Sequence, residues 1–88
     1  MAARTVDVLN KRGLHARASA KFVTLAAQQS AEIEVEKDGN RVCGTSIMGL
    51  MMLGAAYGDT ITISAEGDGA EQAVAALADL VEAKFGED

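Results

Sequence analysis

The chain has 88 residues, of which 49% are hydrophobic and 24% are charged, and its net charge at pH 7 is −5. This length fits one domain, residues 1–88, whose thin core leaves little room for a deep substrate pocket, so any chemistry is expected at the surface. The acidic net charge argues against a nucleic-acid partner, and no apolar run is long enough to span a membrane.

The hydrophobic pattern predicts both strands and helices, since alternation of apolar residues is typical of strands and spacings of three and four are typical of helices. In chain order the predicted elements are a strand near residues 5–8, a helix at 16–27, strands at 32–36 and 41–43, a short helix at 46–53, a strand at 60–64 and a helix at 70–85. The order β-α-β-β-α-β-α predicts an α/β (α+β) two-layer open-faced sandwich. We expect a mainly antiparallel four-stranded sheet, covered on one face by three helices.

Local signals mark the ends of several predicted elements. Asp38-Gly39 is typical of a tight hairpin between the second and third strands. Thr45 or Ser46 is expected to cap the short helix. Asp68 is the predicted N-cap of the last helix, with Glu71 as its capping-box partner.

The charges are distributed unevenly along the chain. Residues 1–21 carry five basic residues against one acidic residue, a net charge of +4. Residues 22–88 carry three basic residues against twelve acidic ones, a net charge of −9. The basic segment contains the only histidine, His15, and a local positive field suits an anionic group or an acidic partner surface. Chance clustering of solvated charges gives the same pattern.

His15 stands at the predicted start of the helix at 16–27. The backbone N–H groups of Ala16, Arg17 and Ala18 begin this helix, where such groups lack partners within the helix and the dipole adds positive charge. The helix start therefore suits an anion, and it favours a neutral imidazole that can act as a nucleophile. The guanidinium of Arg17 offers a planar set of donors suited to a phosphoryl group. A histidine in this position is also often only a surface cap.

Two blocks of sequence resemble one known family. Gly13-Leu14-His15-Ala16-Arg17 resembles the active-site segment of the HPr family, the histidine-containing phosphocarriers of the bacterial phosphoenolpyruvate-dependent phosphotransferase system. Ser46-Ile47-Met48-Gly49, followed by Leu53-Gly54, resembles the regulatory-serine segment of that family. The element order and the chain length match the family as well. The chain departs from the family at Ala18, where a proline usually follows the arginine, and alanine restores a backbone N–H in the first helical turn.

The resemblance implies roles for particular residues. It identifies His15 as the histidine that is phosphorylated at Nδ1, Arg17 as the arginine that contacts the phosphoryl group, and Ser46 as a serine modified by an ATP-dependent kinase. It also implies a partner-docking surface that comprises Ala20, Ile47, Met48 and Met51.

The resemblance further implies the partners of the chain. These are enzyme I of the phosphotransferase system as donor, enzyme IIA-type proteins as acceptors, and an HPr kinase/phosphorylase acting on Ser46. Such a chain is a carrier and not an enzyme, and we expect it to be monomeric because its site must meet successive partners. A regulatory docking module of the nitrogen-related branch is the alternative.

A third class of function, catalysis with His15 as a general base, requires a group that orients the imidazole and a concave substrate site. The sequence shows neither. One histidine and one cysteine do not make a metal site, and no Walker-type loop is present, so no cofactor is expected. The single cysteine, Cys43, and the lack of a signal peptide point to the cytoplasm.

The Met-rich segment at 47–53 has two interpretations. Leu50 and Leu53 are expected in the core, with Ile47, Met48 and Met51 exposed as an adaptable surface for several partners. The alternative is that all of these side chains belong to the core. Ser46 likewise has a purely structural alternative, as the N-cap of the short helix.

Overall fold

Four strands and three helices follow one another along the chain as the hydrophobic pattern predicts. The computed structural model describes residues 1–87. Its elements are β1 (Ala2–Asp7), α1 (Ala16–Ala27), β2 (Glu32–Lys37), β3 (Asn40–Cys43), α2 (Ile47–Met52), β4 (Thr60–Glu66), α3 (Ala70–Glu82) and a short 3₁₀ turn, η1 (Lys84–Gly86). Within this described part of the chain, no helix is both long and apolar enough to cross a membrane.

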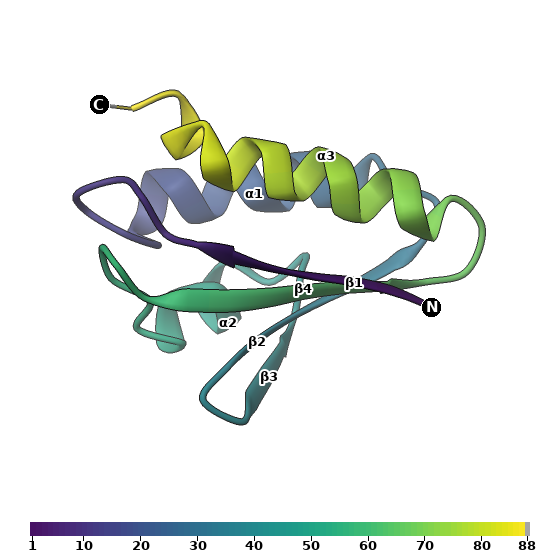
Figure 1. Cartoon of the computed structure of the whole chain (residues 1–88), viewed down its shortest axis with the longest axis horizontal. Coiled ribbons are helices and arrows are strands. Elements are labelled where there is room, and N and C mark those ends of the chain that lie inside the picture. Colours follow the sequence, from purple (N-terminus) through teal and green to yellow (C-terminus); the bar gives the residue numbers. More distant parts are fainter. Residues whose placement is uncertain (88) are drawn as a thin grey trace.

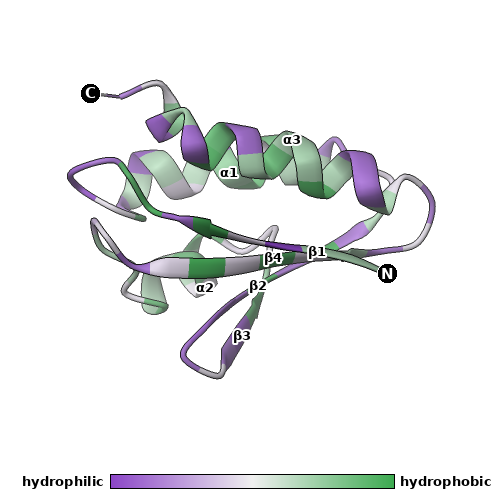
Figure 2. Cartoon of the chain, in the orientation of Figure 1, coloured by the Kyte–Doolittle hydropathy of each residue, from purple (hydrophilic) through white to green (hydrophobic). Residues whose placement is uncertain are grey.

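The four strands form one sheet in the order β1-β4-β2-β3, and each neighbouring pair is antiparallel. Hydrophobic and polar residues alternate along β4 (Figure 2), which buries Ile61 and Ile63 on one face. The helices α1 and α3 run over that face, while the other face is open (Figure 1). The chain is therefore an open-faced sandwich, and the predicted fold class is confirmed.

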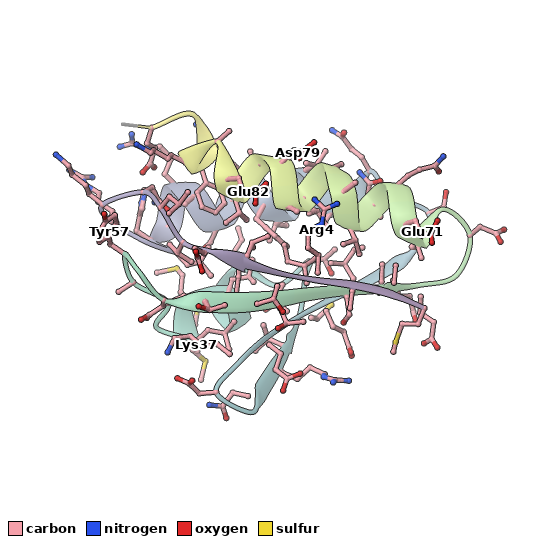
Figure 3. All side chains as sticks on the ribbon, in the orientation of Figure 1. Arg4, Lys37, Tyr57, Glu71, Asp79 and Glu82 are labelled. Atoms are coloured by element: carbon pink, nitrogen blue, oxygen red, sulfur yellow. The ribbon has the colours of Figure 1, made fainter. Side chains whose placement is uncertain are left out.

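The core lies between the sheet and the helices. Its largest fully buried side chains include Phe22 of α1, Leu77 of α3 and Ile63 of β4. Leu50 joins them from α2, which packs against α1 and β3. Full burial of each such side chain stabilises the fold by about 1.5–3 kcal/mol. Acidic side chains such as Glu71, Asp79 and Glu82 lie along the exposed surface of α3 (Figure 3).

Two of the predicted helix and hairpin signals are confirmed. Asp38 and Gly39 both have positive φ, 52° and 83°, as a type I′ hairpin turn requires, and Lys37 pairs with Asn40. Ser46, rather than Thr45, caps α2, because its Oγ accepts a hydrogen bond from the Gly49 N–H at 2.9 Å.

The predicted capping box of α3 is wrong. Gly69 occupies the N-cap position with φ of 75°, and no side chain caps this helix. The chain enters α3 through Gly67 and Gly69, both with positive φ, and this turn places Asp68 one residue too early to act as the N-cap.

The last helix is also shorter than predicted. It ends at Glu82 instead of Phe85, because Lys84 and Phe85 adopt left-handed φ values of 60° and 55°. Left-handed residues cannot continue a right-handed helix, so the chain turns back at η1. This turn brings Glu87 within hydrogen-bond distance of His15.

Candidate functional site

His15 is held at the start of α1 by the loop that precedes it. Gly13 has φ of 64°, and a Cβ at this position would lie 2.3 Å from the Ala55 carbonyl oxygen, so only glycine fits. The next residue, Leu14, is buried and donates its N–H to the same carbonyl at 2.9 Å. His15 then takes the N-cap position in an extended conformation. The loop and the helix thus fix the imidazole from both sides.

Each nitrogen of the His15 ring has its own partner. Nδ1 accepts a hydrogen bond from the Arg17 backbone N–H at 3.3 Å. Nε2 lies 2.6 Å from Oε2 of Glu87. An ionised carboxylate can only accept, so Nε2 carries the proton and donates it, while Nδ1 keeps its lone pair. The two partners therefore assign the neutral tautomer that has its proton on Nε2 and its lone pair on Nδ1.

Glu87 is itself held in place by Asn10. The Asn10 side-chain Nδ2 donates to Oε1 of Glu87 at 3.1 Å and to the Gly13 carbonyl at 2.8 Å, and Asn10 is fully buried. Burial raises the pKa of the Glu87 carboxyl, but the hydrogen bonds from His15 and Asn10 and the charge of Arg17 outweigh it and lower this pKa below its ordinary value. Glu87 is therefore ionised at neutral pH.

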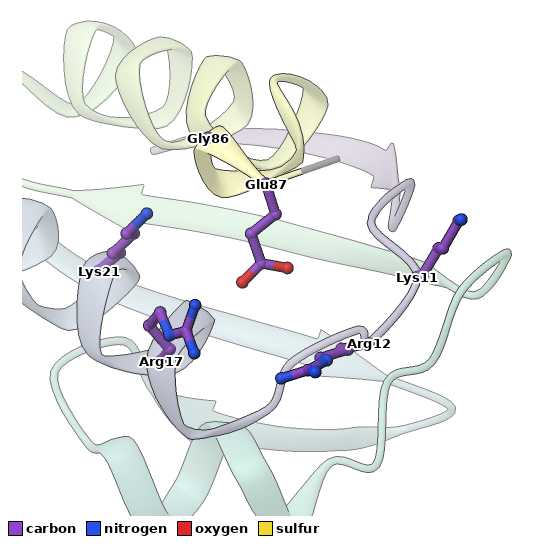
Figure 4. Close-up of a pocket in the computed structure, with 6 residues that line it drawn as sticks. All are labelled: Lys11, Arg12, Arg17, Lys21, Gly86 and Glu87. Atoms are coloured by element: carbon purple, nitrogen blue, oxygen red, sulfur yellow. The ribbon is translucent and has the colours of Figure 1, made fainter.

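A basic pocket lies beside the ring. It has a volume of about 370 Å³, and its lining consists of Lys11, Arg12, Arg17, Lys21, Gly86 and Glu87. Figure 4 shows the Glu87 carboxylate pointing into this pocket, between Arg17 and Arg12. Four basic side chains against one carboxylate make a strongly positive surface, which suits an anionic group.

The helix start differs in part from the prediction. Ala16 and Arg17 are exposed, whereas Ala18 is fully buried. The expectation that Ala18 offers an N–H to an anion needs correction, because its backbone is not accessible. The alanine packs into the core beneath the first turn of α1 and leaves Arg17 as the exposed donor residue.

The predicted surface on α2 is exposed. Ile47, Met48 and Met51 are 40%, 71% and 42% exposed, while Leu50 and Leu53 are buried, so the alternative that all belong to the core is wrong. The sequence analysis missed Met52, which is 80% exposed. We call Ile47, Met48, Met51 and Met52 the α2 patch. Ala20 lies elsewhere, in a groove between α1 and Leu80 that Arg17 and Lys21 also line.

Ser46 does not join the residues around His15. It caps the start of α2, whereas Ala55, which contacts the His15 loop, follows the other end of that helix. Six helical residues separate the two ends by about 9 Å along the axis. Any influence of Ser46 on His15 must therefore act across α2.

Sequence analysis found neither Asn10 nor Glu87. No motif points to Asn10, and Glu87 lies 72 residues from His15 along the chain. The one signal in the sequence is Gly86, since a glycine after a helix is typical of a turn that ends the helix. Such a turn could direct the next residue, Glu87, back toward the rest of the domain. Within residues 1–87, no group of three or more His, Cys, Asp or Glu side chains is placed to hold a metal ion.

Comparisons with known proteins cover nearly the whole chain. A family model described as "PTS HPr component phosphorylation site" matches residues 2–83. Phosphocarrier protein HPr of Neisseria meningitidis is 47% identical over 99% of this chain and 98% of that protein. Phosphocarrier protein NPr of Shewanella violacea is 42% identical over 96% and 92%. The crystal structure of HPr-C-His from Thermoanaerobacter tengcongensis matches with a TM-score of 0.95 at 50% identity, covering 100% of this chain and 99% of that one.

Proposed function

The chain belongs to the HPr family of phosphocarrier proteins of the phosphotransferase system, and we propose that His15 is its phosphoryl acceptor. A phosphoenolpyruvate-charged enzyme I donates the phosphoryl group, and enzyme IIA-type proteins receive it. The observation that carries this proposal is the lone pair of Nδ1, held at the start of α1 beside a pocket with four basic side chains. Arg17 lines that pocket and stabilises the phosphoryl group.

In the proposed step, the hydrogen bond from the Arg17 N–H to Nδ1 breaks, and the Nδ1 lone pair attacks the phosphorus carried by the donor. The Nδ1–P bond forms while the bond between phosphorus and the donor breaks, and the electron pair of the broken bond stays with the donor. Transfer to the acceptor repeats the step with His15 as the leaving group. Catalysis of phosphoryl transfer consists mainly of positioning and charge stabilisation, so the chain acts as a reactant protein whose partners supply most of the catalysis.

We propose that these partners dock on the α2 patch and on Ala20. Four exposed apolar side chains on a helix of six residues form an adaptable surface, since methionine fits partners of different shape. The patch and the basic pocket together offer an apolar contact and a positive field to a partner with an acidic surface.

The test is the intact mass of the chain after incubation with phosphoenolpyruvate and enzyme I. We expect one acid-labile phosphoryl adduct on the wild type and none on His15→Ala. Enzyme I must phosphorylate a known HPr in the same assay. An adduct on both variants, or on neither, would contradict the role of His15.

Regulation through Ser46 is a second part of the proposal. A phosphate on Ser46 adds roughly −1.5 to −2 charge at the start of α2, beside the α2 patch. This charge repels an acidic partner surface before His15 can react. We therefore expect Ser46→Asp to slow phosphorylation of His15 by enzyme I. Two control variants separate the effects: Ser46→Ala removes the cap without adding charge, and Thr45→Asp adds charge while the Ser46 cap is kept. An unchanged rate for Ser46→Asp would remove the regulatory role.

The similarity to NPr of Shewanella violacea favours a second candidate, a regulatory docking module of the nitrogen-related branch. This candidate also carries the phosphoryl group on His15 and differs in its acceptors. Incubating the phosphorylated chain with acceptor proteins of each branch distinguishes the two, because only the cognate acceptor discharges it rapidly.

A further inference from the structure

Glu87 makes the shortest contact to the reactive ring, although it lies outside the residues 2–83 that the family model matches. We propose that Glu87 is a positioning residue that selects Nδ1 of His15 as the nitrogen that receives the phosphoryl group. This inference rests on the proposed function of His15. It adds a residue that acts through the imidazole without touching phosphorus.

The selection follows from the proton on the ring. A neutral imidazole carries one proton, on either nitrogen, and only the other nitrogen has a lone pair to attack phosphorus. Oε2 of Glu87 lies 2.6 Å from Nε2, within the range of a charge-assisted hydrogen bond. The carboxylate keeps the proton on Nε2 and also covers that nitrogen, which is otherwise the less hindered of the two. The reactive lone pair is thereby confined to Nδ1.

Glu87 also affects the charge that develops during transfer. When Nδ1 bonds to phosphorus, the ring gains positive charge while the proton remains on Nε2. The neighbouring carboxylate stabilises that charge in the same way as a carboxylate that orients a catalytic histidine. No proton leaves the ring in this step, so the arrangement is restored when the group passes to the acceptor.

The segment that carries Glu87 is held at several points. Lys84, Phe85 and Gly86 have φ values of 60°, 55° and 76°, a run of left-handed residues that two non-glycine side chains disfavour. Such a conformation persists only where the surroundings fix it. Phe85 is buried in the core, and Nζ of Lys21 donates to its carbonyl at 2.7 Å.

Asn10 completes the support of this segment. Its Nδ2 bridges Oε1 of Glu87 and the Gly13 carbonyl, so the carboxylate and the loop that carries His15 are tied together. The Glu87 carboxylate points into the basic pocket, but these contacts mean that it is not loosely held there. Its two oxygens have separate partners, and this fixes its orientation toward Nε2.

The test measures the tautomer and the phosphorylated nitrogen by NMR of the ¹⁵N-labelled imidazole. The variants are Glu87→Ala, Glu87→Gln and the control Glu82→Gln, which removes an exposed charge from α3. We expect the Nε2–H tautomer to dominate in the wild type and in Glu82→Gln. In Glu87→Ala the preference is lost, part of the phosphoryl group appears on Nε2, and the rate of phosphorylation falls about tenfold, as for other partners that orient a histidine.

Glu87→Gln keeps an acceptor oxygen without the charge. Compared with Glu87→Ala, it should therefore restore the preference for the Nε2–H tautomer but not the full rate of phosphorylation. An unchanged tautomer ratio and phosphorylation at Nδ1 alone in Glu87→Ala would overturn the inference. The tautomer is measured without any phosphoryl donor. A wild type that takes no phosphoryl group would therefore contradict the proposed function, while the tautomer ratios still decide the role of Glu87.

Discussion

Arg17 contributes two different groups to the site. Its backbone N–H donates to Nδ1 of His15, and its guanidinium lines the basic pocket. Substitution Arg17→Ala removes only the second. Hydrogen bonds to charged groups contribute about 1.5–3 kcal/mol, so we expect phosphorylation of His15 to slow by roughly 10- to 100-fold. Steady-state kinetics with enzyme I measure this effect.

The matched control for that substitution is Arg41→Ala. Arg41 is exposed on β3 and pairs with Glu34 and Glu36, away from the basic pocket. Equal losses in the two variants would mean that general charge, and not the position of Arg17, determines the rate. Arg17→Lys should recover only part of the rate, because an ammonium group lacks the planar pair of donors.

The carboxyl of Glu87 predicts a pH dependence with a definite sign. Its folded pKa is lowered, so its contribution to stability is complete above the unfolded value, near 4.5, and is lost as the pH falls through the folded pKa. We expect a ¹³C-detected titration of Glu87 with a midpoint below 4.5. In His15→Ala the midpoint should rise, because one of the hydrogen bonds that lower it is gone. The same midpoint in both proteins would contradict the contact.

The site residues differ in how far the sequence could reveal them. His15 and Arg17 were predictable because a helix start and a short motif are local features. Asn10 and Glu87 were not, because their contact joins residues 77 positions apart and depends on a left-handed turn that no local pattern specifies. The sequence analysis found no group that orients the imidazole, and Glu87 is that group.

Among the elements, the loop between β1 and α1 has the strictest steric requirement. Gly13 combines a positive φ with a position where a Cβ would lie 2.3 Å from the Ala55 oxygen. Gly13→Ala should therefore destabilise the fold by about 2–4 kcal/mol and displace His15. Urea unfolding gives the change in free energy, and phosphorylation kinetics at a temperature where the variant is folded give the change at the site.

Gly39 provides the matched control for this loop. It has φ of 83°, but a Cβ there would meet nothing within 4 Å. Gly39→Ala should cost only the backbone strain, about 1–2 kcal/mol, and leave phosphorylation unchanged. A Gly13→Ala variant no less stable than Gly39→Ala would show that the Ala55 contact relaxes freely.

Prediction of the elements succeeded where side-chain patterns are strong and failed where glycines set the path. The bounds of α1, Ala16–Ala27, agree with the prediction at both ends, because a polar turn precedes the helix and polar residues follow it. The helix α3 begins at Ala70 as predicted, but its N-cap is Gly69, with φ of 75°, instead of Asp68, and it ends at Glu82 instead of Phe85 because Lys84 has φ of 60°. Neither value follows from hydrophobic periodicity.

At the scale of the whole molecule, the fold turns an uneven sequence into two oppositely charged surfaces. Four of the five basic residues of the first segment line the pocket beside His15. The acidic residues of β2 and β4 lie on the open face of the sheet, where Glu32 pairs with Glu66 and Glu34 pairs with Ser64. In the sequence, this separation of charge appears only as the change from a basic segment, residues 1–21, to an acidic one, residues 22–88.

The separation of a basic surface around His15 from an acidic sheet face predicts that added salt lowers the rate of association with an acidic partner. Electrostatic steering raises association rates by factors of 10 to 10³, so we expect kcat/KM of enzyme I for the chain to fall about tenfold between low and high ionic strength. Lys11→Gln with Arg12→Gln should lower the rate at low salt and flatten the salt dependence, because these side chains line the pocket, whereas the hydrogen bonds of the His15 ring are to Glu87 and to the Arg17 N–H. Arg41→Gln, on the acidic face, should leave the slope unchanged. A slope that is equally steep in all three proteins would assign the steering to the molecule's total charge instead of to the basic surface around His15.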